Sequence, residues 1–388
     1  MLVQTHKYFV LQHQFDGVRP GAACDRRWNS YDPRVMSSDD ASPLLTRREA
    51  LAGLSGAAWV ATGATAGLLG AGCTAKQAQG SAVRVISSEG TQVVTIQRLM
   101  LTQGYFRAFG LAPQMLAVNS GTSIIGALLR RNADICVFSG FSQLIAAIDR
   151  GADLKILGGA SVKGQQALFS RNPAVRHVRD LVGRTIGVGA VGAQLYQVAA
   201  ALLEKKGVSL DQVRFVDIGS SADVFRAVVA GTVDAGDGEA DVLAMADRLG
   251  VHMLEDGDYA TQLPEYTWQA SFTSTAAIRE MRPTLVRTLA AYCKGFRFVQ
   301  SPASRDAFVA AQLEVLRPAN LRQARSRAEA QWSYVQSRQP YARNLELSEE
   351  RVQYMQELNI RLGVQRRFLP YDRLVDASLA REAVALLE

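Results

Sequence analysis

Short, mostly apolar segments alternate with amphipathic segments along the chain from residue 83 to about residue 160. Short apolar segments are typical of buried strands, and apolar residues at helical spacing are typical of helices that pack on a sheet. The pattern predicts strands at 83–86, 114–118, 134–138 and 154–158, and helices at 93–109, 123–130 and 143–150. This alternation indicates an α/β architecture.

A second alternating segment follows, and the chain then becomes predominantly helical. The expected strands of this part lie at 184–188, 213–218 and 234–237, and the expected helices at 193–205 and 221–230. Apolar residues at helical spacing then predict four helices, at 283–300, 305–316, 321–336 and 348–362. The pattern therefore predicts two α/β units and a helical C-terminal part.

The pattern before residue 83 is that of an export signal. Arg47 and Arg48 precede an uncharged run of mostly small residues at 50–72, which Cys73 follows. The segment TRREAL at 46–51 resembles the twin-arginine consensus, so we expect export of the folded protein across the membrane. An ordinary transmembrane helix is the alternative, because the run is long enough to cross a bilayer.

Cys73 ends a segment that resembles a lipoprotein cleavage site. Gly70 stands where leucine is usual, so a lipid tether through Cys73 and a freely diffusing form both remain open. Residues 1–45 are polar and irregular, although signals of this kind usually start close to the arginines. Our hypothesis is that translation starts at Met36 and that the upstream extension is not part of the natural precursor.

Composition limits the chemistry that the chain can perform. The net charge of +7 is spread out, without a dense Lys/Arg run that would indicate nucleic-acid binding. A mild positive field fits an anionic small ligand, and the alternative is that it has no particular function. Cys136 and Cys293 fall in apolar patterns and are expected to be buried, while His177 and His252 lack the spacing of metal ligands. We expect no metal and no cofactor.

A glycine-rich segment, GVGAVG at 187–192, stands between a predicted strand and a predicted helix. It matches the G-x-G-x-x-G pattern of dinucleotide sites, in which Asp217 would face a ribose. The alternative, which we favour in an exported protein, is a helix start that binds an anion or another polar ligand group.

Three further segments carry candidate ligand contacts. The junctions at 119–122 and 139–142 place hydroxyl groups and backbone N–H groups at predicted helix starts, where a plain N-cap is the alternative. Asp237, Glu239 and Asp241 crowd one glycine-rich loop. Such carboxylates can perform acid–base chemistry or bind a metal or an amine, and a solvated loop is the alternative.

Five segments, in their order and spacing, resemble the nitrate/sulfonate/taurine-type substrate-binding proteins of ABC transporters, a group that includes binders of thiamine-pyrimidine precursors. They are GYFRAFGL at 104–111, ALLRRNADI at 127–135, GADLK at 151–155, DLVGRTIGV at 180–188 and VVAGTVDA at 228–235. The resemblance implies a two-lobed, Venus-flytrap periplasmic-binding fold. Lobe 1 would comprise 83–171 and 269–388, and lobe 2 would comprise 172–268.

The resemblance also implies a ligand in the cleft between the lobes, held by strand-end loops and helix starts. Carried over by position, the contacts are Ser88, Glu89, Gly90, Ser139, Gly140, Phe141, Ala190, Val191, Gly192, Ala193, Gln194, Tyr196, Asp237, Glu239 and Trp268. Two departures weaken a sulfonate or nitrate assignment. Relatives often carry an acidic-Pro pair near Ala240, and the loop at 189–194 is less polar than the serine-rich loop of sulfonate binders.

The expected function is that of a monomeric, non-enzymatic solute-binding protein in the periplasm or on the outer face of the cell membrane. It would bind a small polar or anionic organic ligand, sulfonate-, nitrate- or taurine-like or heterocyclic, and deliver it to a membrane permease. Two alternatives remain: a pyrimidine-synthesising enzyme on the same fold, whose relatives carry His- and Cys-rich iron-binding features, and a ligand-sensing subunit.

Overall fold

The computed structural model describes residues 80–118, 120–190 and 192–388. The extension at 1–45, the signal at 46–73 with Cys73, and Val191 lie outside the described residues. Among the helices that are described, none combines the length and the apolar character needed to cross a bilayer.

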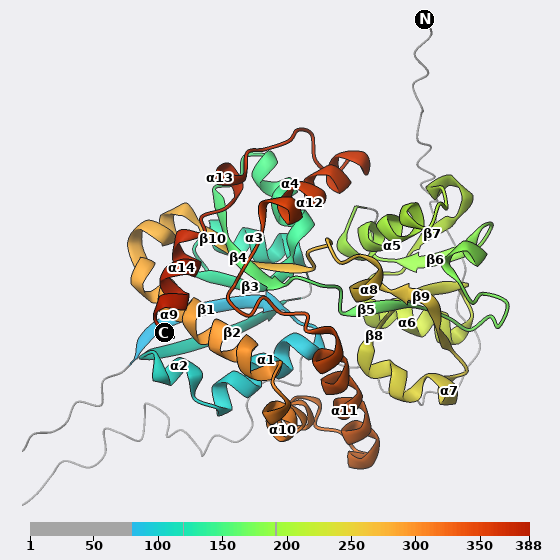
Figure 1. Ribbon diagram of the computed structural model, residues 1–388, viewed down its shortest axis with the longest axis horizontal. Coiled ribbons are helices and arrows are strands. Elements are labelled where there is room, and N and C mark those ends of the chain that lie inside the picture. The colour runs from blue at the N-terminus through green and yellow to red at the C-terminus, as the bar shows by residue number, and fades with distance from the viewer. Residues whose placement is uncertain (1–79, 119, 191) are drawn as a thin grey trace, which may run out of the picture. The chain divides into compact units, whose positions relative to one another are not determined.

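The first lobe is built on a five-stranded sheet with the strand order β2-β1-β3-β10-β4 (Figure 1). β1 runs parallel to β2 and β3, whereas β10 is antiparallel to both β3 and β4. The strands are β1 (Ser81–Ser88), β2 (Leu111–Val118), β3 (Ile135–Gly140), β4 (Leu154–Ser161) and β10 (Gln269–Ser274).

The second lobe repeats this plan with the strand order β7-β6-β8-β5-β9. β6 runs parallel to β7 and β8, and β5 is antiparallel to β8 and β9. The strands are β5 (Gln166–Ser170), β6 (Thr185–Val188), β7 (Arg214–Asp217), β8 (Ala235–Glu239) and β9 (His252–Asp258).

Helices follow most of the parallel strands, and six more form the C-terminal part (Figure 1). The helices of the two lobes are α1 (Thr91–Thr102), α2 (Tyr105–Ala108), α3 (Gly121–Leu129), α4 (Phe141–Asp149), α5 (Gln194–Lys205), α6 (Ser221–Ala230), α7 (Ala246–Leu249) and α8 (Tyr259–Gln262). The C-terminal helices are α9 (Thr275–Val299), α10 (Arg305–Leu316), α11 (Leu321–Arg338), α12 (Glu349–Arg361), α13 (Tyr371–Leu374) and α14 (Ser378–Ala385).

Local sequence signals explain where several helices begin and end. The Ser220 hydroxyl accepts a hydrogen bond from the Asp223 N–H at the start of α6, and Gly231 ends that helix with a φ of 75°, a conformation that favours glycine. The helix predicted over 93–109 is in fact two helices. Gly104, with a φ of 69°, separates α1 from α2 because a residue in this conformation cannot continue a right-handed helix.

The predicted α/β architecture is confirmed, but two strands of the second sheet were not predicted. The chain passes between the sheets at residues 162–165, so β5 belongs to the second sheet, whereas the sequence placed 166–170 in lobe 1. β5 begins and ends with polar residues, and β9 carries four charged or polar side chains. β5 pairs with both β8 and β9, and these pairings make β5 and β9 strands. Local hydrophobicity does not reveal such pairing between residues that are distant in sequence.

The C-terminal helices contact both lobes. α12 packs against α4 of the first lobe and α5 of the second, and one apolar cluster joins Ile86, Leu168 and Met355 across all three parts. α11 packs against the 3₁₀ helix Ala240–Met245 of the second lobe. The chain passes between the two lobes at 162–165 and at 259–268. The C-terminal part adds a third connection, through packing.

A fully buried asparagine on α12 links the two lobes by hydrogen bonds. Asn359 Oδ1 accepts from the Ser142 hydroxyl of α4 and from Gln197 Nε2 of α5, the latter at 3.2 Å. Asn359 Nδ2 donates to the Ser142 carbonyl at 3.1 Å. Because buried polar groups are costly when unpaired, this arrangement favours one relative position of the two lobes.

Asp237, an expected ligand contact, lies instead in the core of the second lobe. Its carboxyl is fully buried on β8, and neither oxygen has a partner in ordinary hydrogen-bond geometry among the described residues. Burial raises the pKa of Asp237 to about 7, and the nearby Tyr259 hydroxyl partly offsets this shift. Asp237 lies two residues before Glu239, the last residue of β8, so its side chain is further inside the lobe than that of Glu239.

Replacing Asn359 with alanine should lower the free energy of unfolding by about 2–3 kcal/mol, because it leaves buried partners in both lobes unsatisfied. Urea unfolding followed by circular dichroism measures this loss. Gln353→Ala, on the exposed face of the same helix, is the matched control and should change stability by no more than about 0.5 kcal/mol. Equal losses in both variants would contradict a bridging role.

Asp237→Asn should stabilise the protein increasingly between pH 4 and pH 7. The pKa of Asp237 is raised on folding, so the folded state retains a proton that the unfolded chain releases, and wild-type stability falls as pH rises through this window. The difference should grow by at most about 1.4 kcal/mol per pH unit and level off above pH 7. Thermal unfolding at four pH values tests this, with exposed Asp217→Asn as the control. The same trend in both variants would refute a burial effect.

Candidate functional site

A cavity of about 400 Å³ lies between the two lobes, where strands of both sheets end. Ser88 and Gly140 close β1 and β3 in the first lobe, and Glu239 closes β8 in the second. Gly189 and Gly219 follow the ends of β6 and β7 closely. In α/β proteins, ligands bind outside the carboxyl ends of parallel strands, and this cavity occupies that position in both sheets at once.

Five helices begin at the cavity, and three of them lack a side-chain cap. The N-cap residues of α1, α4 and α5 are Gly90, Gly140 and Ala193, none of which makes a side-chain hydrogen bond to the helix. The first N–H groups of a helix have no partner within it and carry a partial positive charge. The three starts therefore offer donors to a bound group from both lobes.

Carboxylates and glutamines dominate the polar side chains of the cavity. Glu89 contributes one carboxylate from the first lobe and Glu239 one from the second. Among the described lining residues, none is Lys, Arg, His or Cys. The six glutamines of the lining are Gln92, Gln143, Gln165, Gln166, Gln194 and Gln269.

Glu239 reaches across the cleft from the second lobe toward the first. A methyl group placed on Gly90 would lie 3.9 Å from Glu239 Oε1, which brings this carboxylate to the start of α1. Burial and the nearby Asp241 carboxylate raise the pKa of Glu239 to about 7, and the Arg327 guanidinium opposes both effects.

Two glutamines fix the walls of the cavity through hydrogen bonds between elements. Gln194 Nε2, at the start of α5, donates to the Trp268 carbonyl at 2.9 Å and so joins the two lobes. Gln269 Nε2 donates to the Ser88 hydroxyl at 3.2 Å, and that hydroxyl donates to the Phe138 carbonyl at 2.9 Å. The Trp268 ring stacks on Tyr259, with ring centroids 6.2 Å apart, and forms part of the cavity wall.

The structure brings most of the predicted site residues together at this cavity. Those in the lining are Ser88, Glu89, Gly90, Ser139, Gly140, Ala190, Ala193, Gln194, Glu239 and Trp268. Phe141 is instead fully buried in the core, and the Tyr196 ring packs edge-on against Phe215 at 4.8 Å. Gly192 is absent from the lining, as is Asp237, and Val191 lies outside the described residues.

The sequence analysis missed the glutamines apart from Gln194, together with Ser220 and Ser221 at the start of α6. Gln92, Gln143 and the two serines lie at or near predicted strand-to-helix junctions, whereas no sequence signal marks Gln165, Gln166 or Gln269. Asp217 is exposed and absent from the lining, so it does not accompany Gly189 as a dinucleotide site would require.

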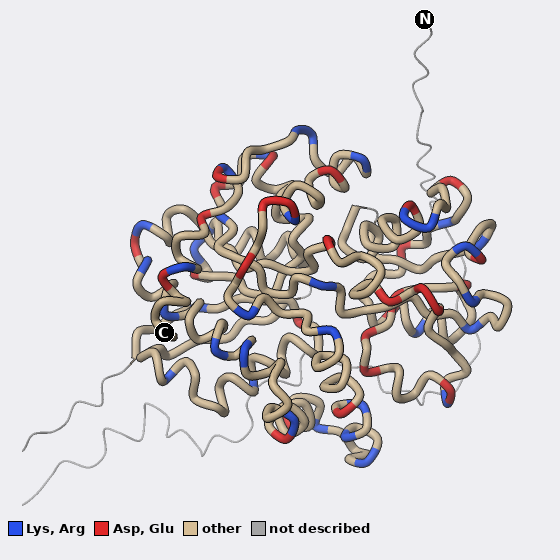
Figure 2. Tube along the Cα trace, in the orientation of Figure 1, with Lys and Arg blue, Asp and Glu red and all other residues tan. Residues whose placement is uncertain are grey.

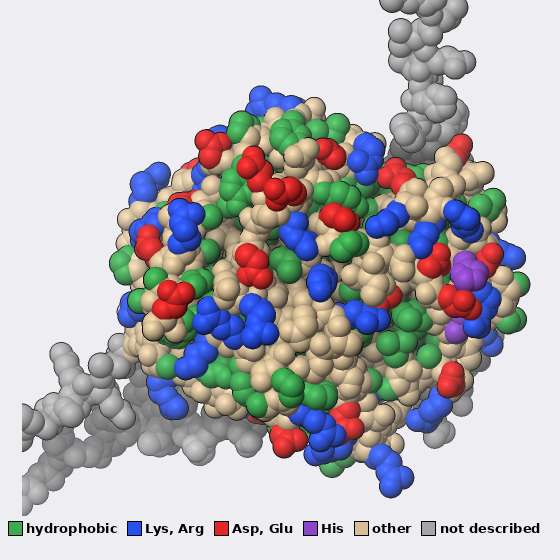
Figure 3. Space-filling model, viewed as in Figure 1, with side chains coloured by type: hydrophobic (Ala, Val, Ile, Leu, Met, Phe, Trp, Pro, Cys, Tyr) green, Lys and Arg blue, Asp and Glu red, His purple; other side chains and the backbone are tan. Residues whose placement is uncertain are grey.

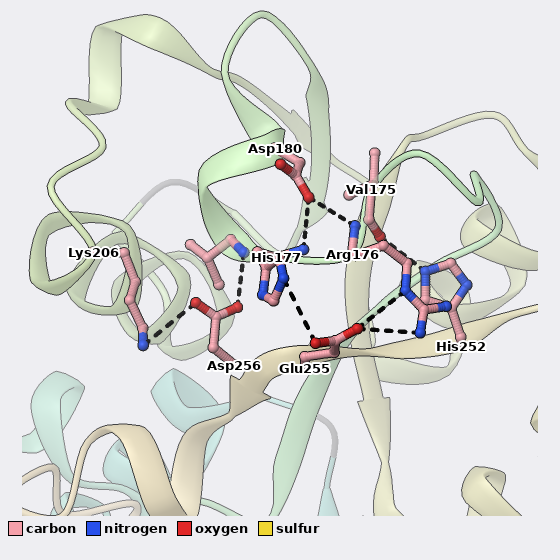
Figure 4. Close-up of polar contacts among 9 residues, drawn as sticks. Val175, Arg176, His177, Asp180, Lys206, His252, Glu255 and Asp256 are labelled. Atoms are coloured by element: carbon pink, nitrogen blue, oxygen red, sulfur yellow. Dashed lines mark hydrogen bonds and ion pairs between the residues drawn. The ribbon is translucent and has the colours of Figure 1, made fainter.

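A second, surface hollow on lobe 2 contains charged groups that are paired with one another (Figure 4). Lys206 Nζ lies 3.4 Å from Asp256 Oδ2, and His177 Nε2 lies 3.6 Å from Glu255 Oε2. Asp180 accepts hydrogen bonds from the backbone N–H groups of Arg176 and His177. These contacts join His177 and Lys206 to β9.

The remaining surface charge is dispersed. Lys and Arg side chains are distributed over both lobes (Figure 2), and on the face shown in Figure 3 they are interspersed with Asp and Glu. Within the part of the chain that the structure describes, uncapped helix starts and unpaired carboxylates therefore come together at the inter-lobe cavity.

Comparison with solved structures identifies the fold. The alkanesulfonate-binding protein SsuA from Xanthomonas axonopodis pv. citri, bound to MOPS, is 16% identical with a TM-score of 0.60, covering 78% of this chain and 98% of that protein. The aliphatic sulphonate-binding protein SsuA from Escherichia coli is 16% identical with a TM-score of 0.61, covering 76% and 92%.

An enzyme shares the same fold. The desulfurization enzyme DSZB is 15% identical with a TM-score of 0.54, covering 79% of this chain and all of that one. At these identities the likeness establishes a two-lobed periplasmic binding protein fold and not a function.

Sequence comparison identifies the family. No curated protein sequence matches the chain significantly. The family model described as NMT1/THI5 like, in contrast, matches residues 99–303, which span strands of both sheets and most of the cavity lining. This agrees with the resemblance to nitrate/sulfonate/taurine-type binding proteins that five segments of the sequence indicated. Since the match covers more than half of the chain, the protein belongs to the NMT1/THI5-like family.

Proposed function

We propose that this protein is the extracytoplasmic solute-binding component of an ABC importer and holds a small polar organic molecule between its lobes. The observation that carries the proposal is the convergence of three uncapped helix starts, from both lobes, on one cavity of about 400 Å³. A cavity of this size suits a small molecule, and a cleft between lobes can close on it. The sulfonate-binding neighbours support this assignment through their fold.

The side chains of the cavity favour binding over turnover. The described lining contains neither His nor Cys, so the Ser–His and Cys–His pairs of nucleophilic catalysis are absent from it. The hydroxyl of Ser88 is held between the Phe138 carbonyl and Gln269, a geometry that positions the wall. Both cysteines of the described chain, Cys136 and Cys293, are buried, and burial raises the pKa of each thiol.

The same proposal includes the route and the partner of the protein. The segment 46–73 would direct twin-arginine export, which delivers an already folded two-lobed protein, and Cys73 would decide between a tethered and a free form. The closed, liganded monomer would present a surface spanning both lobes to a membrane permease. A ligand-sensing subunit would bind in the same way, and co-purification with a permease separates the two roles.

The purified full-length protein should show ligand-dependent thermal stabilisation without consumption of the ligand. A ligand at a hundred times its Kd stabilises a folded protein by about 2.7 kcal/mol, which is readily detected as a rise in Tm. The screen comprises alkanesulfonates, nitrate, aromatic acids, amines and pyrimidines, with mass spectrometry of the compound after incubation. A product formed from a hit would indicate an enzyme, and no hit in any class would contradict the proposal.

Filling the cavity should abolish this stabilisation. Ala190 is exposed and lines the cavity, so Ala190→Trp would place an indole ring in the space that a ligand needs. We expect at least a tenfold loss of affinity by calorimetry, with the Tm of the unliganded protein changed little. Ala230→Trp, at an exposed position of α6 outside the lining, is the matched control and should bind normally. Unchanged binding by Ala190→Trp would exclude this cavity as the site.

A further inference from the structure

We propose that Asp237 is a positioning residue that holds Trp268 in the cavity wall through the inter-lobe segment 259–268, and that a proton on Asp237 keeps this segment in place. Asp237 lies on β8 of the second lobe, and the segment carries Tyr259 and Tyr266 before it reaches Trp268. The contact requires no ligand, so its test is independent of the proposed binding function.

Polar atoms without partners are concentrated on Asp237 and on this segment. The Asp237 carboxyl and the hydroxyls of Tyr259 and Tyr266 are buried, and within the described chain none of them has a partner in ordinary hydrogen-bond geometry. The two tyrosines are the titratable neighbours of Asp237, and Tyr354 of α12 is a further neighbour of Tyr266. Burial raises the pKa of each tyrosine, so all three are uncharged at neutral pH. An ionised Asp237 is therefore a buried charge without a counter-ion, which is costly.

The two tyrosine rings connect Asp237 to the inter-lobe cavity. The Trp268 ring stacks on Tyr259 with ring centroids 6.2 Å apart, and its centroid lies 6.1 Å from that of Tyr266. Trp268 in turn lines the cavity, and its carbonyl accepts a hydrogen bond from Gln194 Nε2 at 2.9 Å. A shift of either tyrosine therefore changes the surface that supports Trp268.

The inter-lobe segment can move more readily than the strand that carries Asp237. β8 lies in the middle of the second sheet, paired with β6 on one side and with β5 on the other. The segment begins with the four-residue helix α8, and the ion pair of Asp258 with Arg338, at 2.8 Å, fixes the residue before it. Movement of the tyrosines would admit water to the Asp237 carboxyl at a lower cost than disruption of the sheet.

The proton on Asp237 links this movement to pH. Burial raises the pKa of Asp237 to about 7, and the Tyr259 hydroxyl opposes the shift. When the segment opens and water reaches the carboxyl, the pKa falls toward its ordinary value of about 4. Between these two values the open form releases a proton that the closed form retains, so opening becomes more favourable as pH rises, by up to about tenfold per pH unit. Above pH 7 both forms are ionised and the effect levels off.

Hydrogen exchange of the full-length protein between pH 5 and pH 8, followed by mass spectrometry and corrected for the intrinsic exchange rates, tests the link. We expect the amides of 259–268 to exchange faster than those of β8, with an opening constant that rises by up to about tenfold per pH unit until it levels off near pH 7. In Asp237→Asn, which has no proton to release, the opening constant should not change with pH. Exchange of the segment only together with β8, or pH-independent opening in the wild type, would overturn the proposal.

Two further variants assign the effect to its residues. Tyr259→Phe keeps the ring that stacks on Trp268 and removes the hydroxyl that favours ionised Asp237, so the levelling-off should move to higher pH by about half a unit or more. Glu239→Gln, on the same strand, is the matched control because burial also raises the pKa of Glu239 to about 7. It should keep the wild-type profile, and loss of the pH dependence in Glu239→Gln would overturn the role of Asp237.

Tryptophan fluorescence shows whether the effect reaches the cavity wall. The emission of Trp268 is the difference between a protein and its Trp268→Phe variant, measured in the wild-type and in the Asp237→Asn background. In the wild type it should change with a midpoint near pH 7, where Asp237 ionises in the closed form, and it should stay constant with Asn at position 237. Constant emission in both backgrounds would exclude a positioning effect of Asp237 on Trp268.

Discussion

The parallel strands of the two sheets end at one shared cavity, and this arrangement determines which groups can contact a bound molecule. Helices that follow such strands begin at that cavity, so their unpaired N–H groups collect there without any dedicated basic side chain. In three helices the N-cap is Gly90, Gly140 or Ala193, which leaves those groups uncovered. Each helix without a side-chain cap is less stable than a capped one, and its first backbone N–H groups are left available as hydrogen-bond donors.

The charge of the whole chain gives little information about the charge of the cavity. The net value of +7 is a sum over the whole chain, and the charged side chains of the described residues are dispersed over both lobes (Figure 2), whereas the cavity contains two carboxylates and no basic residue in its described lining. A field from dispersed surface charges is screened within about 8–10 Å at ordinary salt concentrations, while groups in a closing cleft act at contact distance. The charged side chains that line the cavity therefore affect a bound molecule more strongly than the net charge of the whole chain does.

The sequence predicted the helices and strands more accurately than it predicted which side chains are buried. Strand and helix periodicity located β1 and β3 and the helices after them, because buried parallel strands are apolar throughout. It did not locate β5 or β9, whose partners are distant in sequence. For the candidate site, it indicated loops that line the cavity but could not distinguish Glu239, at the cleft, from Asp237, in the core. Glu239 is the last residue of β8 and Asp237 lies two residues inside it, and local sequence does not encode where that strand ends.

The C-terminal helices hold the two lobes together as well as completing the fold. α11 is tied to the second lobe through Arg327 with Asp241 and through Arg338 with Asp258, the latter at 2.8 Å, and α12 is tied to both lobes through Asn359. On the proposed binding function, any hinge opening would have to carry these helices along or separate these pairs. Contacts far from the ligand would then contribute to the free-energy cost of opening the cleft.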